Sequence, residues 1–174
     1  MFGWMLRRQD RSCLQTRSQI LRQRIQTIYP QWLLRQLQKA VVSELTTMVM
    51  QIDATPKVSK QIADELLNHA FDELQHLRTV VNYISNHYEN VKIQYCLDST
   101  YVDRLCSDDE LEILSVIQEA EMESIRLYTR IIQVADIVGD IETVEIFEDI
   151  LKTETKHYDD FANKVGGKRP FLLR

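Results

Sequence analysis

The sequence predicts an all-α protein built as an antiparallel four-helix bundle with a basic N-terminal extension. Apolar residues recur at helical spacing over four long segments. Only 4 Gly and 3 Pro occur among the 174 residues, so few turns separate these segments. The connections between them are short, long and short in that order, as in a bundle with one crossover. Because 44% of the residues are hydrophobic, a chain of this length can bury one substantial core.

The first predicted hairpin covers residues 31–88. Its first helix follows Pro30 and runs over about residues 31–54, and Thr55-Pro56 ends it because proline cannot continue a helix. Its second helix runs over about residues 57–88. Each helix has an apolar stripe, a row of residues three or four apart that faces the core. The two stripes are Leu33, Leu37, Val41, Glu44, Met48 and Gln51, and then Ile62, Leu66, Ala70, Glu73, Leu77, Val80 and Ile84.

The second predicted hairpin follows residues 89–106, which lack helical periodicity and are long enough to cross from one end of a bundle to the other. Ser107 with Glu110 three residues later forms a capping box that starts the third helix. Gly139-Asp140 is the turn, and Gly166-Gly167 ends the fourth helix, which begins near Glu142. The stripes are Leu114, Ile117, Glu121, Ile125, Tyr128, Ile132 and Ala135, and then Phe147, Ile150, Glu154, His157, Phe161 and Val165.

Charge divides the chain into an extension (1–29), the bundle (30–165) and a short tail (166–174). The first forty residues hold eight basic residues and one acid, whereas the remainder holds 13 basic and 25 acidic residues. The extension is open to three interpretations. It is a short extra helix that packs on the bundle or on a neighbouring subunit, an organelle-targeting peptide, or a basic arm for nucleic acid or another anionic partner.

Cysteine usage and hydropathy indicate a cytoplasmic protein, with organelle targeting by residues 1–29 as the alternative. The three cysteines form no CxxC pair, which disfavours a disulfide framework or a zinc knuckle and favours a reducing compartment. No run of 18 apolar residues occurs, so we expect no transmembrane segment.

Acidic residues and histidines interrupt the apolar stripes in a repeated pattern. Each half of the chain has one stripe glutamate, then a turn, then a Glu-x-x-His motif on the next stripe. A buried unpaired carboxylate costs several kcal/mol, whereas a whole domain is stable by only about 5–15 kcal/mol. Something must therefore neutralise these groups. The six residues are Glu44, Glu73, His76, Glu121, Glu154 and His157.

Spacing predicts that the six side chains meet halfway along the bundle. Pro56 lies near the midpoint between the two glutamates of the first hairpin, and Gly139 lies near the midpoint of the second. In antiparallel helices each second glutamate therefore returns to the level of the first. Four carboxylates balance two divalent cations, and oxygen ligands with two imidazoles suit iron or manganese better than zinc. This is the ligand set of di-iron carboxylate bundles.

The segments SELTTMVMQ (43–51), HAFDELQHL (69–77), AEMESIRLY (120–128) and ILKTETKHYDDF (150–161) resemble the ferritin-like superfamily, and within it the bacterioferritin group. The resemblance covers about residues 31–165. It implies a ferritin-like bundle with two iron ions, or manganese in their place. It also implies that Glu44 and Glu121 are terminal ligands, Glu73 and Glu154 bridge the metals, and His76 and His157 bind one metal each.

The resemblance also implies supporting residues. Tyr128 lies seven residues after Glu121, where the family often has a tyrosine beside the site; the symmetric position is Gln51, a departure from that pattern. Asp72 is expected to orient His157. Leu74 replaces the methionine that binds haem in bacterioferritins, so no haem is expected. The remaining histidines, His69 and His87, lack a Glu-x-x-His partner and are assigned to the surface or to supporting positions.

The function that the resemblance implies is a di-iron ferroxidase, which oxidises Fe(II) with O2 or peroxide for iron storage or detoxification. We expect a homo-oligomer, with a closed shell as the form suited to storage. One alternative keeps the site and makes the protein a di-iron oxygenase, oxidase or peroxide reductase; the lack of a rubredoxin-like CxxC disfavours a self-contained peroxide reductase. A further alternative is a mini-ferritin-like protein that associates with nucleic acid through its basic arm.

Overall fold

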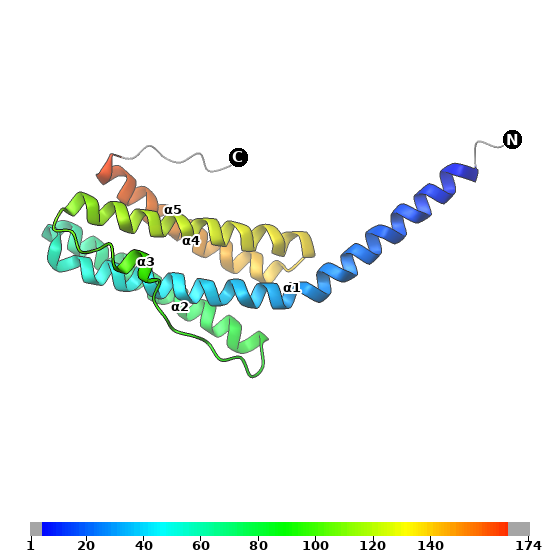
Figure 1. Cartoon of the computed structure of the whole chain (residues 1–174), viewed down its shortest axis with the longest axis horizontal. Helices are drawn as coiled ribbons and strands as arrows, with labels where there is room; N and C mark the ends of the chain where they lie inside the picture. Colours follow the sequence, from blue (N-terminus) through cyan, green and yellow to red (C-terminus); the bar gives the residue numbers. More distant parts are fainter. Residues whose placement is uncertain (1–4, 167–174) are drawn as a thin grey trace.

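Four long helices pack as two hairpins and make the body of the molecule (Figure 1). The computed structural model describes the backbone of residues 5–166 and the side chains of residues 23–166. The described helices are α1 (Met5–Ala54), α2 (Lys60–His87), α3 (Ser99–Val102), α4 (Glu110–Val138) and α5 (Ile141–Val165), with one 3-10 turn, η1 (Thr55–Lys57). No strand occurs among the described residues. The predicted all-α four-helix bundle is confirmed.

Short turns close each hairpin. The turn η1 contains Pro56 and joins α1 to α2, which begins at Lys60 rather than near Lys57. Gly139 follows α4 in the left-handed region at φ 79°, which glycine adopts without strain, so the chain reverses at once. The next residue, Asp140, is the N-cap of α5, and its carboxylate accepts a hydrogen bond from the Thr143 amide.

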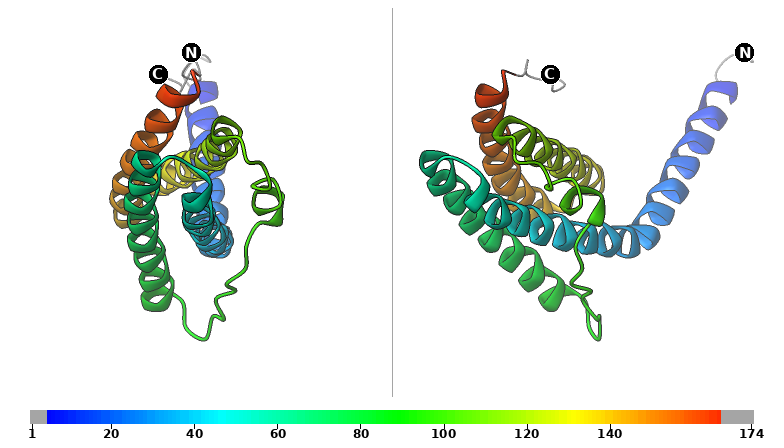
Figure 2. Two further views of the ribbon diagram at one scale, coloured as in Figure 1. Left: turned by 90° about the vertical axis from the view of Figure 1, so that its left-hand side faces the viewer. Right: turned by 60° about the vertical axis from the view of Figure 1, so that its left-hand side comes forward.

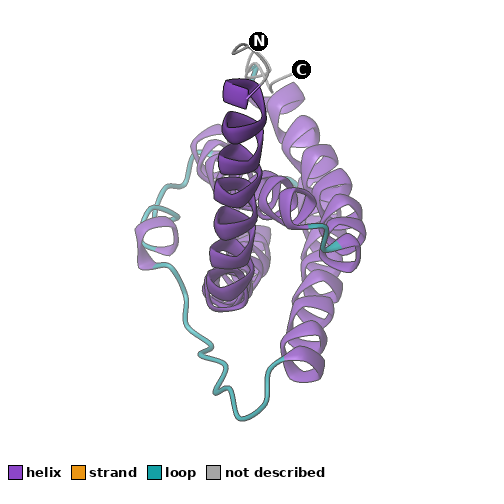
Figure 3. Cartoon of the chain, turned by 90° about the vertical axis from the view of Figure 1, so that its right-hand side faces the viewer, coloured by secondary structure: helices purple, strands orange, loops and turns teal. Residues whose placement is uncertain are grey.

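The long connection from α2 to α4 crosses the outside of the bundle (Figures 2 and 3). It contains α3, which the sequence did not predict. Its contacts with the bundle include two hydrogen bonds. The Asp98 amide donates to Thr46 Oγ1 at 2.9 Å, and Lys57 Nζ donates to the Leu105 carbonyl at 2.7 Å. The predicted capping box at Ser107 is wrong, because Asp109 directly precedes α4 and its carboxylate accepts from the first free amides.

Helix α1 begins at Met5 and continues through Pro30, so the prediction that it starts at Gln31 is wrong. Proline lacks an amide hydrogen and disrupts one helical turn, but it does not prevent helix on either side. Tyr88 Oη donates to the Pro30 carbonyl at 3.1 Å, and Tyr29 Oη donates to Asp140 at 2.7 Å, which tie this turn to the bundle. Beyond it the N-terminal part of α1 projects away from the bundle (Figure 1), rather than packing on it as a separate short helix. Most of the predicted tail lies outside the described residues.

Two apolar core clusters lie toward opposite ends of the bundle, and a polar layer separates them on all four long helices. The first cluster includes Leu37, Val80, Ile131 and Phe147, and the second includes Ala54, Leu66, Ile117 and Phe161. Both clusters shield the polar layer from water. Among the described residues, no helix combines the length and hydropathy needed to cross a lipid bilayer.

Candidate metal centre

The polar layer contains all six side chains that the sequence singles out, and every long helix contributes. The exposed fraction of each is 9% or less. They form two overlapping groups, within each of which one potential ligand atom per residue lies within 4.8 Å of the others. Glu73 and Glu154 belong to both groups, which is the arrangement that bridging carboxylates require. The groups are Glu44, Glu73, His76 and Glu154, and then Glu73, Glu121, Glu154 and His157.

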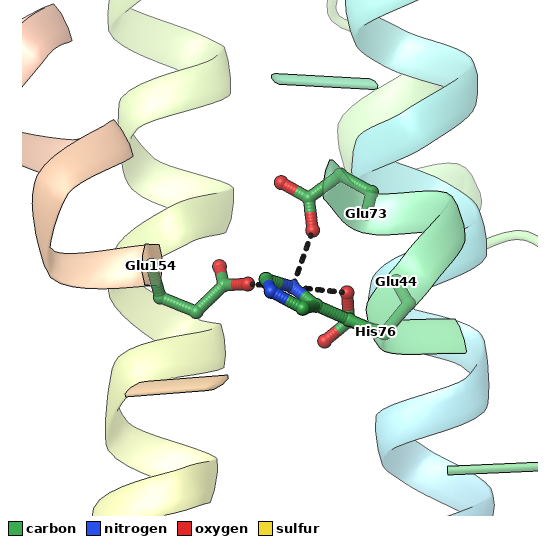
Figure 4. Close-up of side chains that lie close together, drawn as sticks. All are labelled: Glu44, Glu73, His76 and Glu154. Atoms are coloured by element: carbon green, nitrogen blue, oxygen red, sulfur yellow. Dashed lines mark ion pairs between the residues drawn. The ribbon is translucent and has the colours of Figure 1, made fainter. Parts of the chain in front are cut away.

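In the first group the imidazole of His76 points at three carboxylates (Figure 4). Its Nδ1 lies 2.8 Å from Glu154 Oε1, 3.3 Å from Glu44 Oε2 and 3.5 Å from Glu73 Oε2. These residues come from α1, α2 and α5, so packing of the two hairpins creates the group. One small cation can therefore contact the carboxylates and the imidazole together.

In the second group His157 also turns Nδ1 inward. Nδ1 lies 3.0 Å from Glu73 Oε1, whereas Nε2 faces outward and lies 3.2 Å from Asp72 Oδ2. A carboxylate on one ring nitrogen fixes the tautomer and leaves the other nitrogen free to bind a metal. The structure thus places Asp72 where it can orient His157.

Tyr128 and Gln51 lie at the centre as hydrogen-bond donors. Tyr128 Oη donates to Glu44 Oε1. Gln51 Nε2 donates to Glu121 Oε1 at 2.8 Å and to Glu73 Oε1 at 3.2 Å. Each terminal glutamate therefore has one oxygen held by a donor from the other hairpin, and its second oxygen is available.

Among the side chains that the structure describes, several potential ligand atoms of the polar layer have no hydrogen-bond partner. Such buried orphans are rare in native proteins, because each costs the desolvation of a polar group. Here the orphans include at least one oxygen of every one of the four glutamates and Nδ1 of His76. Divalent cations bound at the two groups would satisfy them, so the residues present fit a pair of metal ions.

A family model described as Ferritin-like domain matches residues 31–167. The chain belongs to the ferritin-like domain family. Comparison with curated proteins gives no match. Two solved structures show the same fold at low sequence identity, and each comes from a ferritin-like protein.

The first is the bacterioferritin of Rhodobacter capsulatus, solved with a metal-free dinuclear site and a haem iron. It is 20% identical, with a TM-score of 0.67 over 77% of this chain and 83% of that chain. The second is a ferritin-like, diiron-carboxylate protein of Bacillus anthracis str. Ames. It is 18% identical, with a TM-score of 0.69 over 78% of this chain and 96% of that chain. The predicted ferritin-like fold is confirmed.

Burial and mutual repulsion raise the pKa values of three glutamates of this ferritin-like protein and favour their protonated forms. Burial, followed by the charge of Glu73, raises the pKa of Glu44 to about 8. The same two causes, with additional charge from neighbouring glutamates, raise the pKa of Glu121 and of Glu154 well above the usual range. Burial and the charge of Glu44 also raise the pKa of Tyr128, so its hydroxyl keeps the proton that it donates.

In the remaining three groups, hydrogen bonding favours the charged form in the absence of metal. Burial opposes ionisation of Glu73, but hydrogen bonds with His157 and His76 outweigh it and lower its pKa. Burial likewise disfavours the imidazolium of His76, yet hydrogen bonds to Glu44 and Glu73 raise its pKa to about 10. The pKa of His157 is raised in the same way, against burial, by Glu73 and other carboxylates.

His69 is a buried neighbour of the centre rather than a surface residue. Its ring stacks on His157 with centroids 4.0 Å apart, and its exposed fraction is 3%. Burial and the charge of His157 lower its pKa to about 4. The signal in the sequence was its place four residues before Glu73, one helical turn along α2. His87 lies at the other end of α2, where it pairs with Glu142 at 3.2 Å.

Proposed function

We propose that this protein is a di-iron ferroxidase, which binds two Fe(II) ions and oxidises them to Fe(III). The observation that supports this most directly is the set of buried, inward-facing and unpartnered oxygens on four glutamates beside two imidazoles. Four carboxylates match the charge of two divalent ions. Oxygen-rich ligation with nitrogen from histidine suits ferrous iron, and manganese is the alternative occupant.

The overlap of the two groups supports a role for each ligand. Glu73 and Glu154 belong to both groups and would bridge the two ions. Glu44 and His76 would complete one position, and Glu121 and His157 the other. Asp72 would hold the His157 ring in the tautomer whose Nδ1 is free.

Iron is here a substrate, and the protein supplies the place where two ions meet. Each ferrous ion gives up one electron, so two together reduce O2 to hydrogen peroxide, or peroxide to water. The apolar clusters on both sides of the polar layer limit access of water to the ions.

We further propose that copies of the chain associate, and that storage of the oxidised iron requires a closed cytoplasmic shell. Large apolar side chains exposed on one face of α2 support association: Leu67, Phe71 and Leu74 are 49%, 62% and 44% exposed. They lie three or four residues apart and form one stripe that a second copy could cover. Light scattering tests this proposal, since a monomer at working concentration would contradict it.

The ferroxidase proposal is tested with the double variant Glu73→Ala/Glu154→Ala. Fe(II) is added in air, and the initial rate of Fe(III) formation is followed by absorbance. The rate should fall to that of iron without protein, because both bridging carboxylates are gone. The matched control is Asp64→Ala/Glu148→Ala, which removes one exposed carboxylate from each of the same two helices. A double variant that oxidises iron as fast as this control would contradict the proposal.

A further inference from the structure

A separate group of potential ligands lies beside the centre, where α2 packs against α5. It consists of Glu65 and His69 on α2 and Asp160 on α5, and one potential ligand atom from each lies within 4.8 Å of the others. His69 Nε2 lies 3.4 Å from Asp160 Oδ2. None of the six residues of the dinuclear centre belongs to this group, so it would hold an ion of its own.

His69 is the buried member of the group, and its position is well defined. The ring is held between two neighbours: it stacks on His157 at 4.0 Å and meets the edge of Phe161 at 5.1 Å. Its side chain is 4% exposed, and the ring nitrogen that faces the group is Nε2, on the side of Asp160. The stacked and edge-on rings therefore hold Nε2 in place as the potential ligand atom of His69.

The two carboxylates of the group face solvent in part. The side chains of Glu65 and Asp160 are 27% and 32% exposed, so an ion can arrive from water and keep water ligands. One imidazole and two carboxylates, with positions left open for water, make an open site for a divalent first-row metal ion. The carboxylates also balance the two charges of such an ion.

A lysine occupies the edge of this group. Lys164 Nζ lies 2.6 Å from Glu65 Oε1 and donates to the Asp160 carbonyl at 3.3 Å. Its ammonium group neutralises part of the negative charge, as a metal ion would. An incoming ion must therefore compete with Lys164 for Glu65.

We propose that Glu65, His69 and Asp160 form a mononuclear site for a divalent cation such as Fe(II) or Mn(II), outside the dinuclear centre. The stacked rings of His69 and His157 place it next to the buried centre. Its existence does not depend on the proposed function. Its role, as the place where Fe(II) is held before it enters the centre, rests on the proposed ferroxidase function.

The site is tested by equilibrium dialysis of the metal-free full-length protein against Mn(II), with bound metal counted by elemental analysis. The test variant is Glu65→Gln/Asp160→Asn, which keeps the size of two partly exposed side chains and leaves His69 in place. The control is His87→Ala/Glu142→Gln, a His–Glu pair that also joins α2 to α5. The wild type and the control should each bind one ion more than the test variant.

Equal numbers of bound ions in all three proteins would overturn the proposal. The measured quantity is the difference in bound ions between the test variant and the other two proteins. This difference does not depend on whether the dinuclear centre takes up metal, so the result tests the mononuclear site separately from the proposed ferroxidase function. Anomalous scattering from a crystal soaked in Mn(II) locates the ion independently. A peak between Glu65, His69 and Asp160 supports the proposal, and loading of the dinuclear centre without this peak overturns it.

Competition with Lys164 and the role in iron entry give two further readouts. Lys164→Met should lower the Kd of the extra ion roughly two- to five-fold, since a partly exposed ion pair contributes only a small free energy. A Kd that does not fall contradicts the competition.

For Fe(II) oxidation, Glu65→Gln/Asp160→Asn should raise KM for iron at unchanged kcat. An unchanged KM would refute the role in entry while leaving the site itself intact.

Discussion

Loading of the dinuclear centre with two divalent ions should expel about five protons at pH 6.5, because metal ligands must be deprotonated. Without metal, Glu73 is ionised, and His76, with a pKa of about 10, is protonated. The pKa of His157 is raised above 6.5, so it is more than half protonated. The raised pKa values of the other three glutamates of the centre favour their protonated forms, Glu44 with a pKa of about 8.

These protonation states make the metal-free centre close to +1 in charge. The loaded centre has four carboxylates, two neutral imidazoles and two divalent ions, and is neutral. Three protons leave the glutamates and up to two leave the histidines. The affinity for metal should therefore rise steeply with pH between about 6.5 and 8, since every proton released adds a tenfold change per pH unit. Above the pKa of Glu44, metal binding should release one proton fewer, so the slope of log affinity against pH should fall by one.

The assay is isothermal titration of the anaerobic metal-free protein with Mn(II) at pH 6.5. Repeating it in buffers of different ionisation enthalpy gives the number of protons released. The variant Glu65→Gln/Asp160→Asn serves as the background, so that only the dinuclear centre is titrated. Glu44→Gln in that background should release one proton fewer. Release of fewer than two protons would refute the reasoning, because the glutamates would then be ionised before metal arrives.

Three substitutions test the packing around the centre. Asp72→Asn should weaken metal affinity about 10- to 100-fold, because His157 loses the carboxylate that orients it; an unchanged affinity in chelator competition would contradict that role. Tyr128→Phe should destabilise the metal-free protein by about 1–3 kcal/mol in urea unfolding, since a buried oxygen of Glu44 loses its donor; no change would show that the oxygen finds another partner. Phe147→Ala should cost about 3–5 kcal/mol in the same assay, because its side chain is fully buried; a cost below 1 kcal/mol would mean that the core closes the cavity.

The bundle could be predicted because each long helix has one clear apolar stripe. The six polar residues on those stripes could be predicted to converge, because the turn of each hairpin lies near the midpoint between its two glutamates. The structure places all six in one buried layer. Metal binding at that layer stays a prediction.

Features that depend on contacts between distant segments could not be predicted. Pro30 is a helix breaker by local rules, yet α1 continues through it, and contacts with Tyr88 tie that turn to the bundle. His69 precedes Asp72 and Glu73 by one helical turn, yet the side chains that it contacts, Asp160 and His157, come from α5. Periodicity reports which face of a helix is buried, but it does not report which residue of another helix lies opposite.

The two hairpins repeat the predicted ligand pattern but surround it with different donors, so the two proposed metal positions are unequal. The residue seven positions after each terminal glutamate reaches across to the terminal glutamate of the other hairpin. From the second hairpin it is Tyr128, which donates to Glu44; from the first it is Gln51, which donates to Glu121. A phenol can give up a proton or an electron, whereas an amide can only donate a hydrogen bond. Asp72 contacts His157 in the half of the centre where Gln51 is the donor. In the proposed ferroxidase, a side chain capable of redox chemistry thus lies beside Glu44, whereas the amide beside Glu121 only donates a hydrogen bond.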